Sequence, residues 1–210
     1  MKRVVKIVTM LVMVGVPATV SAQVSIAAPR YISGDLPQVP VLSVSGGEVF
    51  LEAVVGTDGR VASTRALRTT PPFTQAVLDA VRDWIFVPAA RPTPVFIAAM
   101  FAPPSLGGPT LGQPPQDIQP ASGAAPMPIA APPAGYPPRA MGSGIVLVDA
   151  TLDDAGVVTD ARIIVPSPAF DAAALGAARA WSFRPPQAGG HAVTSHAYLM
   201  FAFQQPVIGR

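Results

Sequence analysis

The feature that most restricts the fold of this chain is an internal repeat with a constant spacing of 97 positions. The two tryptophans, Trp84 and Trp181, have this spacing. Because an insertion in any element would shift everything after it, an unbroken register indicates that the same backbone occurs twice. The same spacing also joins pairs of glycine, proline or phenylalanine: Pro40 with Pro137, Gly47 with Gly144, Gly59 with Gly156, Pro71 with Pro168, Phe73 with Phe170, Phe86 with Phe183, and Pro88 with Pro185.

The second copy of the repeat carries the patterns of two strands, a helix and a third strand. Residues 144–152 alternate apolar and polar side chains, as a half-buried strand does. Apolar side chains cannot all face inward along the next strand without one extra residue, which predicts a β-bulge near Thr159 and Asp160. Ser167 and Pro168 are suited to start a helix, and an apolar stripe runs from there to Trp181. Residues 191–203 then form the third strand.

This order predicts an α+β fold built from two small β-β-α-β units, each a three-stranded antiparallel sheet with one helix packed on it. We expect a first domain over 39–102 and a second over 136–205. Residues 103–135 are rich in proline, alanine and glycine, a composition that predicts a disordered linker in polyproline II geometry. At about 3.1 Å per residue such a linker can hold the domains on the order of 100 Å apart. Residues 23–38 are expected to be a poorly ordered leader.

Residues 1–22 have the pattern of a secretory signal peptide. Lys2, Arg3 and Lys6 precede a short apolar run, and Val20-Ser21-Ala22 has small residues where signal peptidase cleaves. The apolar run is shorter than the ~20 residues of a membrane-spanning helix. The pattern favours export to the periplasm, and the alternative is an uncleaved anchor in the inner membrane that faces the periplasm. Membrane contact is expected only in that alternative.

Charge and cysteine content exclude several classes of function. Of the 14 basic residues three lie in the signal, which leaves 11 arginines against 12 acidic residues and no lysine. Nucleic-acid binding needs clustered basic side chains and is not expected. The chain has no cysteine, so each domain is held together by its apolar core alone.

The residue types that carry catalysis are sparse. His191 and His196 are the only histidines, and further metal ligands are missing around them. Asp149 and Arg162 recur as Glu52 and Arg65 in the first copy, which predicts cross-strand pairs on the solvated face. No nucleophile elbow or phosphate-binding loop is present. We therefore expect no enzyme activity and no catalytic, cofactor or metal site.

The ordered motifs of the second copy resemble a known family. Tyr136-Pro137, Gly144-x-Val146, Gly156-x-Val158, Phe170 and Trp181-x-Phe183-x-Pro185, followed by an apolar strand, look like the C-terminal domain of TonB-type energy transducers. The resemblance is strong from Tyr136 to about Gln204 and weaker from about Val39 to Phe101. It implies a periplasmic module that contacts outer-membrane transporters, whose extended peptide adds to the last strand as a further β-strand.

The resemblance and the strand pattern together give a set of candidate partner-binding residues. On the last strand the outward side chains are expected to be Thr194, His196, Tyr198 and Met200. Tyr136, Pro137 and Arg139 are candidates for a second peptide contact. The corresponding strand of the first copy, 95–101, is apolar on both faces and is expected to be covered.

Two functions follow from these predictions. The first is a TonB-like protein that binds an outer-membrane transporter by strand addition and serves energy-dependent transport. The alternative is a soluble periplasmic adaptor or envelope scaffold that uses the same domain for protein-protein contacts without energy transduction. Self-association through a sheet edge is a further possible partner interaction.

Overall fold

The computed structural model describes residues 29–38, 46–102 and 125–205. We call residues 29–102 the first half and residues 125–205 the second half. The first half contains β1 (Tyr31–Ser33), β2 (Gly47–Val55), β3 (Val61–Arg68), α1 (Phe73–Arg82), β4 (Ile85–Phe86) and β5 (Thr93–Phe101). The second half contains β6 (Met127–Ala130), β7 (Gly144–Leu152), β8 (Val158–Val165), α2 (Asp171–Arg179), β9 (Ser182–Arg184), β10 (Gln187–Ala188), β11 (His191–Ala192) and β12 (Ser195–Phe203).

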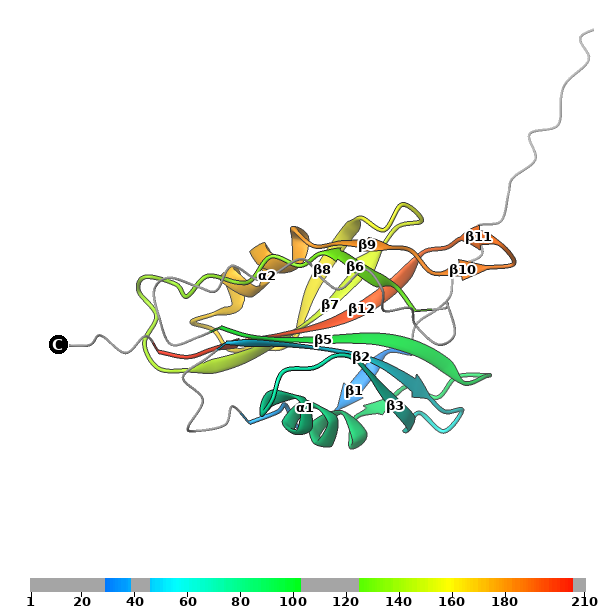
Figure 1. Cartoon of the computed structure of the whole chain (residues 1–210), viewed down its shortest axis with the longest axis horizontal. Helices are drawn as coiled ribbons and strands as arrows, with labels where there is room; N and C mark the ends of the chain where they lie inside the picture. Colours follow the sequence, from blue (N-terminus) through cyan, green and yellow to red (C-terminus); the bar gives the residue numbers. More distant parts are fainter. Residues whose placement is uncertain (1–28, 39–45, 103–124, 206–210) are drawn as a thin grey trace, which may run out of the picture.

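The long strands of both halves form one six-stranded sheet in the order β3-β2-β5-β12-β7-β8 (Figure 1). Neighbouring strands are antiparallel except at the centre, where β12 runs parallel to β5 from Ala197 beside Phe96 to Ala202 beside Phe101. The α+β class is as expected, but the two separate three-stranded sheets are not found. The physical reason is that β5 is apolar on both faces. Such a strand is stable only where both of its faces are buried, as in the centre of a larger sheet.

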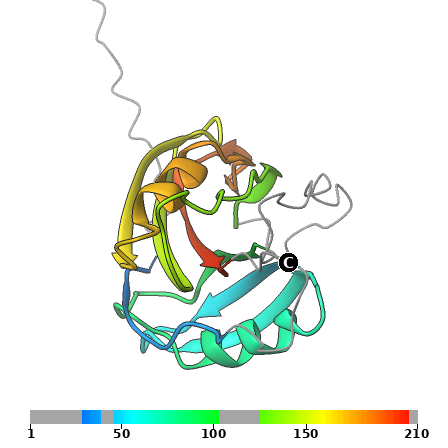
Figure 2. The same ribbon diagram turned by 90° about the vertical axis from the view of Figure 1, so that its left-hand side faces the viewer.

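The two helices cover opposite faces of this sheet (Figure 2). Helix α1 packs on β2 and β3, whereas α2 packs on β7 and β8. Two units of the same handedness whose last strands lie side by side and parallel are related by a half-turn about the strand direction. That half-turn carries the second helix to the other face.

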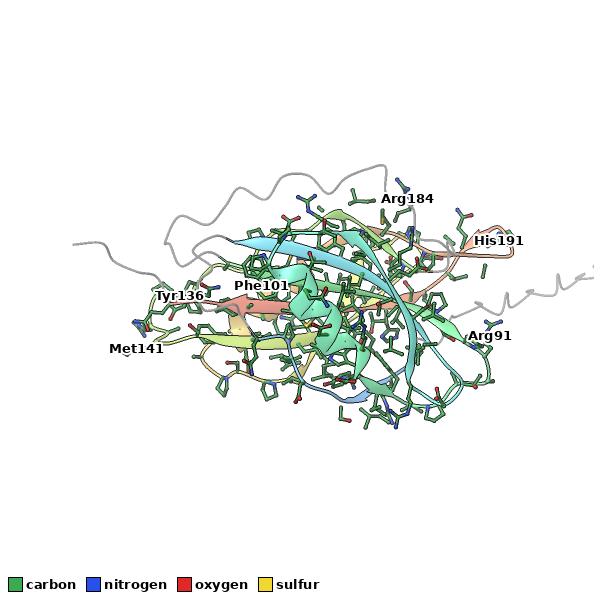
Figure 3. The ribbon with its side chains drawn as sticks, turned by 60° about the horizontal axis from the view of Figure 1, so that its bottom comes forward. Arg91, Phe101, Tyr136, Met141, Arg184 and His191 are labelled. Carbon is green, nitrogen blue, oxygen red and sulfur yellow. The ribbon has the colours of Figure 1, made fainter. Side chains whose placement is uncertain are left out.

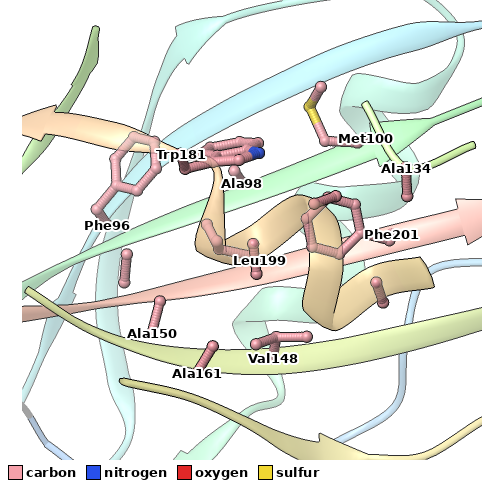
Figure 4. Packing of buried hydrophobic residues seen from close by; sticks show 14 of the residues in the cluster. Phe96, Ala98, Met100, Ala134, Val148, Ala150, Ala161, Trp181, Leu199 and Phe201 are labelled. Atoms are coloured by element: carbon pink, nitrogen blue, oxygen red, sulfur yellow. The ribbon is translucent and has the colours of Figure 1, made fainter. Parts of the chain in front are cut away.

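Each face of the sheet buries a core to which both halves contribute. On the α2 face, Phe96 of the first half lies beside Trp181 (Figure 4). Phe50, also of the first half, lies 6.1 Å from Trp181 and 5.9 Å from Phe96, measured between ring centroids. On the α1 face, Tyr198 of the second half lies 6.4 Å from Trp84 and 5.6 Å from Phe86, measured between ring centroids. The halves therefore share their cores and form one folding unit.

Matching hydrogen bonds recur in the two halves. The indole N–H of Trp84 donates to the Asp35 carbonyl at 2.9 Å, and that of Trp181 donates to the Pro132 carbonyl at 3.0 Å. In both cases the partners are 49 positions apart. Buried indole groups need such a partner, so each tryptophan fixes the segment that begins its own half.

The outer strands carry bulges at equivalent places. In β8, Thr159 has no partner between Asp160, opposite Thr151, and Val158, opposite Leu152, which confirms the predicted bulge. A second irregularity leaves out Ile164. Strand β3 has the same two bulges, at Ala62 and Leu67.

The helix starts differ from the sequence prediction. Helix α2 begins at Asp171, and the side chain of Ser167 makes no capping bond to it. Instead, the Ser167 backbone N–H donates to the Asp171 carboxylate at 2.7 Å, and Pro168 lies in a turn before the helix. The donor and acceptor are therefore exchanged relative to the prediction. The side chain of Asp171, in the first turn of the helix, accepts a hydrogen bond from the backbone that precedes the helix and so fixes the helix start.

Two segments that were expected to be irregular contain strands. Within the predicted leader, β1 pairs with β4, and within the predicted linker, β6 pairs with β9. The ring of Tyr31 in β1 lies 5.0 Å from Trp84 between centroids, and Met127 of β6 belongs to the same core cluster as Trp181. Residues 103–124 of the linker and the predicted signal at 1–22 lie outside the described residues. Within the described ranges, neither helix has the length and apolar character needed to cross a bilayer.

Candidate functional site

The last strand, β12, was expected to offer a free edge to a partner peptide. In the structure it has neighbours on both sides, because it pairs with β7 over nine residues and with β5 over six. Its backbone groups are therefore used within the sheet. The expectation of a free last strand is wrong, because β5 of the same chain lies along the edge where a partner peptide was expected.

The four candidate residues on this strand and just before it differ in their surroundings. Tyr198 and Met200 were expected to face outward, but both are buried in the core that the second half shares with the first. Thr194 and His196 lie at the beginning of the strand and are half-buried. This half-burial leaves Thr194 and His196 as partner-contact predictions.

Tyr198 joins the two halves directly. Its hydroxyl donates to the Pro29 carbonyl at 2.6 Å and accepts from the Tyr31 backbone N–H at 3.1 Å. Burial, and after it the charge of Asp149, raises the pKa of the Tyr198 phenol well above its usual value. The hydroxyl therefore stays protonated and acts as an internal hydrogen-bonding group.

His196 belongs to a small polar group on β7, β8 and β12. Its Nδ1 lies 2.9 Å from the Asp149 carboxylate, and the Arg162 guanidinium donates to the other Asp149 oxygen at 2.9 Å. Burial raises the pKa of Asp149, but the hydrogen bonds and charges of His196 and Arg162 outweigh it, so the pKa is lowered. The predicted cross-strand pair is confirmed, although Asp149 is buried where a solvated position was expected.

The same pair occurs in the first half with different surroundings. Arg65 lies 3.4 Å from Glu52, which is also buried. The position opposite Glu52 on β5 is held by Phe96, and the position opposite Asp149 on β12 is held by Tyr198. His196 stands opposite Thr151, two residues before Tyr198, and its side chain reaches Asp149. The second half alone thus combines a buried carboxylate with a half-buried histidine.

The other candidate residues lie in the loop that precedes β7. The Tyr136 hydroxyl donates to the Gly142 carbonyl at 2.8 Å, and its ring meets the edge of Phe170 at 5.5 Å between centroids. Pro137 is half-buried, and Arg139 and Met141 are exposed, Met141 to 83%. Tyr136 therefore acts as a support for a loop that we call the 136–141 loop.

The candidate residues do not form one patch. Figure 3 shows Tyr136 and Met141 at one end of the molecule, and His191, four residues before β12, at the other. Thr194 and His196 lie toward the His191 end, because β12 begins there. Met141 was not among the residues predicted from the sequence. A methionine between Arg139 and Gly142-Ser143-Gly144 could have been chosen, because methionine is common at binding surfaces.

The described residues offer little for other chemistry. Across residues 29–38, 46–102 and 125–205, no three metal-ligating side chains are grouped to hold an ion. One apolar pocket of about 10 Å³ lies between the halves, which is room for a single water molecule. It is lined by Gly47, Met100, Phe101, Ala102, Pro133, Ala134, Phe201 and Ala202.

Comparison with known proteins agrees with the motifs of the second half. Residues 132–204 match the family model described as the Gram-negative bacterial TonB protein C-terminal domain. No curated protein matches the chain. The matched range begins at Pro132, whose carbonyl accepts the hydrogen bond from Trp181, and ends one residue after β12. Residues 132–204 are therefore a domain of the TonB C-terminal family, which indicates a TonB-like function in envelope transport.

Proposed function

We propose that this protein is a TonB-like adaptor of the cell envelope, which contacts an outer-membrane transporter or another envelope protein without taking its peptide onto the last strand. The observation that carries the proposal is the pairing of β12 with β5 on one side and β7 on the other. Family membership of residues 132–204 supports the envelope role. The first half acts as a divergent copy of the domain, and its strand β5 fills the edge of the second half.

The shared cores argue against opening of this edge during normal function. Separation of β5 from β12 would expose Phe50, Phe96 and Tyr198, which are buried against the other half. An exposed surface of this kind costs about 25 cal/mol for each Å² of apolar area. The partner is therefore bound elsewhere, and the 136–141 loop is the proposed contact, since Arg139 and Met141 project from a supported turn.

Hydrogen exchange of the whole chain tests the occupied edge. A peptide from the periplasmic segment of a transporter is added, and the exchange of β5 and β12 amides is followed. We expect both strands to stay protected. Faster exchange in β5 with continued protection of β12 would show that the peptide replaces β5, and would overturn the adaptor proposal in favour of strand addition.

Photo-crosslinking in cells tests the proposed loop. A photoreactive residue at Arg139 or Met141 is expected to give an adduct with an outer-membrane protein. The control is the same residue at Asp79, which is exposed on α1 in the first half. Adducts at Asp79 as strong as those at Arg139, or none at either loop position, would contradict the proposal.

Localisation is proposed to be periplasmic after cleavage behind Ala22. N-terminal sequencing of the protein from soluble and membrane fractions separates the two alternatives. A chain that begins at Gln23 in the soluble fraction supports an adaptor that does not pull on its partner. An intact N-terminus in the membrane fraction would support the anchored, energy-transducing alternative.

A further inference from the structure

The outer strands β3 and β8 each pair on one side only within the described sheet. An outer strand presents unpaired N–H and C=O groups to which another strand can add. We propose that β8 pairs, antiparallel and about a two-fold axis at Ala161, with β8 of a second copy of this chain. The proposal goes beyond the partner contact proposed above and does not depend on it.

The two outer strands differ in side chains although their backbones match. Around its bulges β8 carries Ile163 and Val165, at positions where β3 has Ala66 and Arg68. Just before β8, the side chain of Val157 is 52% exposed although its backbone bridges to Ser182. Arg60, which bridges to Ile85, stands at the equivalent place before β3. β-Branched side chains favour strand pairing and exposed charges hinder it. Strand β8 is therefore better suited than β3 to pair with a further strand.

The charges of β8 favour a second copy of the same strand as its pairing partner. Asp160 and Arg162 flank Ala161 and lie on the same face, opposite Thr151 and Asp149 of β7. In an antiparallel pair centred on Ala161, Asp160 stands opposite Arg162 of the second copy, and the symmetry repeats this contact. Opposite charges at directly facing positions stabilise a strand pair. The equivalent residues of β3, Ser63 and Arg65, lack this complementarity.

Both side chains have capacity for the new contact. Arg162 uses one nitrogen for Asp149, yet its side chain is 59% exposed and a guanidinium carries five N–H donors. Asp160 is exposed and makes no ion pair with any described residue. The charges therefore fit a second β8 without loss of the Asp149 contact.

The bulges at Thr159 and Ile164 set the length of the pairing. Only residues 160–163 keep a regular register with β7. The contact is therefore short and the association reversible, which agrees with the protection that bulges give to outer strands. The same bulges occur in β3, so they do not explain a difference between the edges.

Cysteine crosslinking tests this geometry, because the chain contains no cysteine. In the proposed pair Ala161 faces its own copy, and directly opposed strand residues have Cα atoms about 4.5 to 5.5 Å apart, within disulfide range. We expect mild oxidation of Ala161→Cys to give a covalent dimer. Thr64→Cys, 97 positions earlier on β3, is the matched control and is expected to stay monomeric.

Charge reversal provides a second measurement that needs no buried substitution. Asp160→Arg places two arginines opposite two arginines, and we expect the dimer dissociation constant to rise about tenfold in sedimentation equilibrium. Ser63→Arg on β3 is expected to leave it unchanged. Equal crosslinking by Thr64→Cys, a disulfide dimer absent from Ala161→Cys, or an Asp160→Arg protein that associates like the parent would overturn the proposal. Crosslinking of Ala161→Cys to another envelope protein would show a different occupant and would also overturn it.

Discussion

The Tyr198 hydroxyl donates a 2.6 Å hydrogen bond to the carbonyl of Pro29, a residue 169 positions earlier in the chain. This bond ties the last strand of the second half to the segment that begins the first. Tyr198 is buried, whereas the other two described tyrosines, Tyr31 and Tyr136, are half-buried.

Removal of this hydroxyl should destabilise the whole sheet. Tyr198→Phe leaves the Pro29 carbonyl and the Tyr31 N–H without their partner, and a buried group that loses its hydrogen bond costs about 1–3 kcal/mol. We expect that loss in the free energy of urea unfolding. Tyr136→Phe is the matched control, because water can replace its half-exposed bond, and its cost should stay below about 1 kcal/mol. Equal losses would mean that Tyr198 does not join the halves.

The response to acid should separate two buried carboxyl groups. The lowered pKa of Asp149 means that its stabilising effect is present above the usual aspartate range and is lost as pH falls through its folded pKa. Burial raises the pKa of Glu48 despite its ion pair with Arg68, so Glu48 favours folding below the usual glutamate range and this effect is lost as pH rises.

Two amide variants test the opposite signs. The free energy of unfolding is measured at steps of about one pH unit between pH 3 and 7. As the pH falls, Asp149→Asn should lose less stability than the parent protein, and Glu48→Gln should lose more. A change of the same sign in both variants would contradict the assigned surroundings of one carboxyl group.

Two glycines with similar backbone angles should differ in their tolerance of a side chain. Gly156 has φ +81° and a Cβ there would lie 1.8 Å from the Phe183 carbonyl oxygen, whereas Gly190 has φ +81° and no atom within 4 Å of that position. Gly190→Ala should cost only the strain of positive φ, about 1–2 kcal/mol. Gly156→Ala should cost more than about 3 kcal/mol, because strand β9 must also move. Equal unfolding free energies for the two variants would contradict the close approach.

Much of each half could be predicted from the sequence because the signals are local. Alternation, the glycine turn and the bulge are set by neighbouring residues, as Gly59 and Gly156 illustrate. The pairing of β5 with β12 depends on contacts between segments about 100 positions apart, which periodicity does not report. A signal was nevertheless present, since Tyr198 to Phe203 is as continuously apolar as β5 and fits a strand buried on both faces.

The strands β1 and β6 were missed for a related reason. Their proline-rich surroundings are typical of leaders and linkers. Yet Ala28-Pro29 and Ile32 recur 97 positions later as Ala125-Pro126 and Ile129, so the repeat extends further upstream than the predicted domain boundaries at 39 and 136. Placement of Tyr136 at a supported loop also needed the contact with Phe170, which brings together residues 34 positions apart.

Shared cores predict that the two halves unfold together. The chain has two tryptophans, one in each half, and both are buried against residues of the other half. Trp84→Phe leaves Trp181 as the reporter of the second half, and Trp181→Phe leaves Trp84 as the reporter of the first. Within each single-tryptophan protein, emission and the far-ultraviolet signal of the whole sheet should give the same urea midpoint, because loss of one half exposes the core of the other. Two separated midpoints, with one reporter unchanged while half of the sheet signal is lost, would show independent domains and would reopen β12 as a strand for partner peptides.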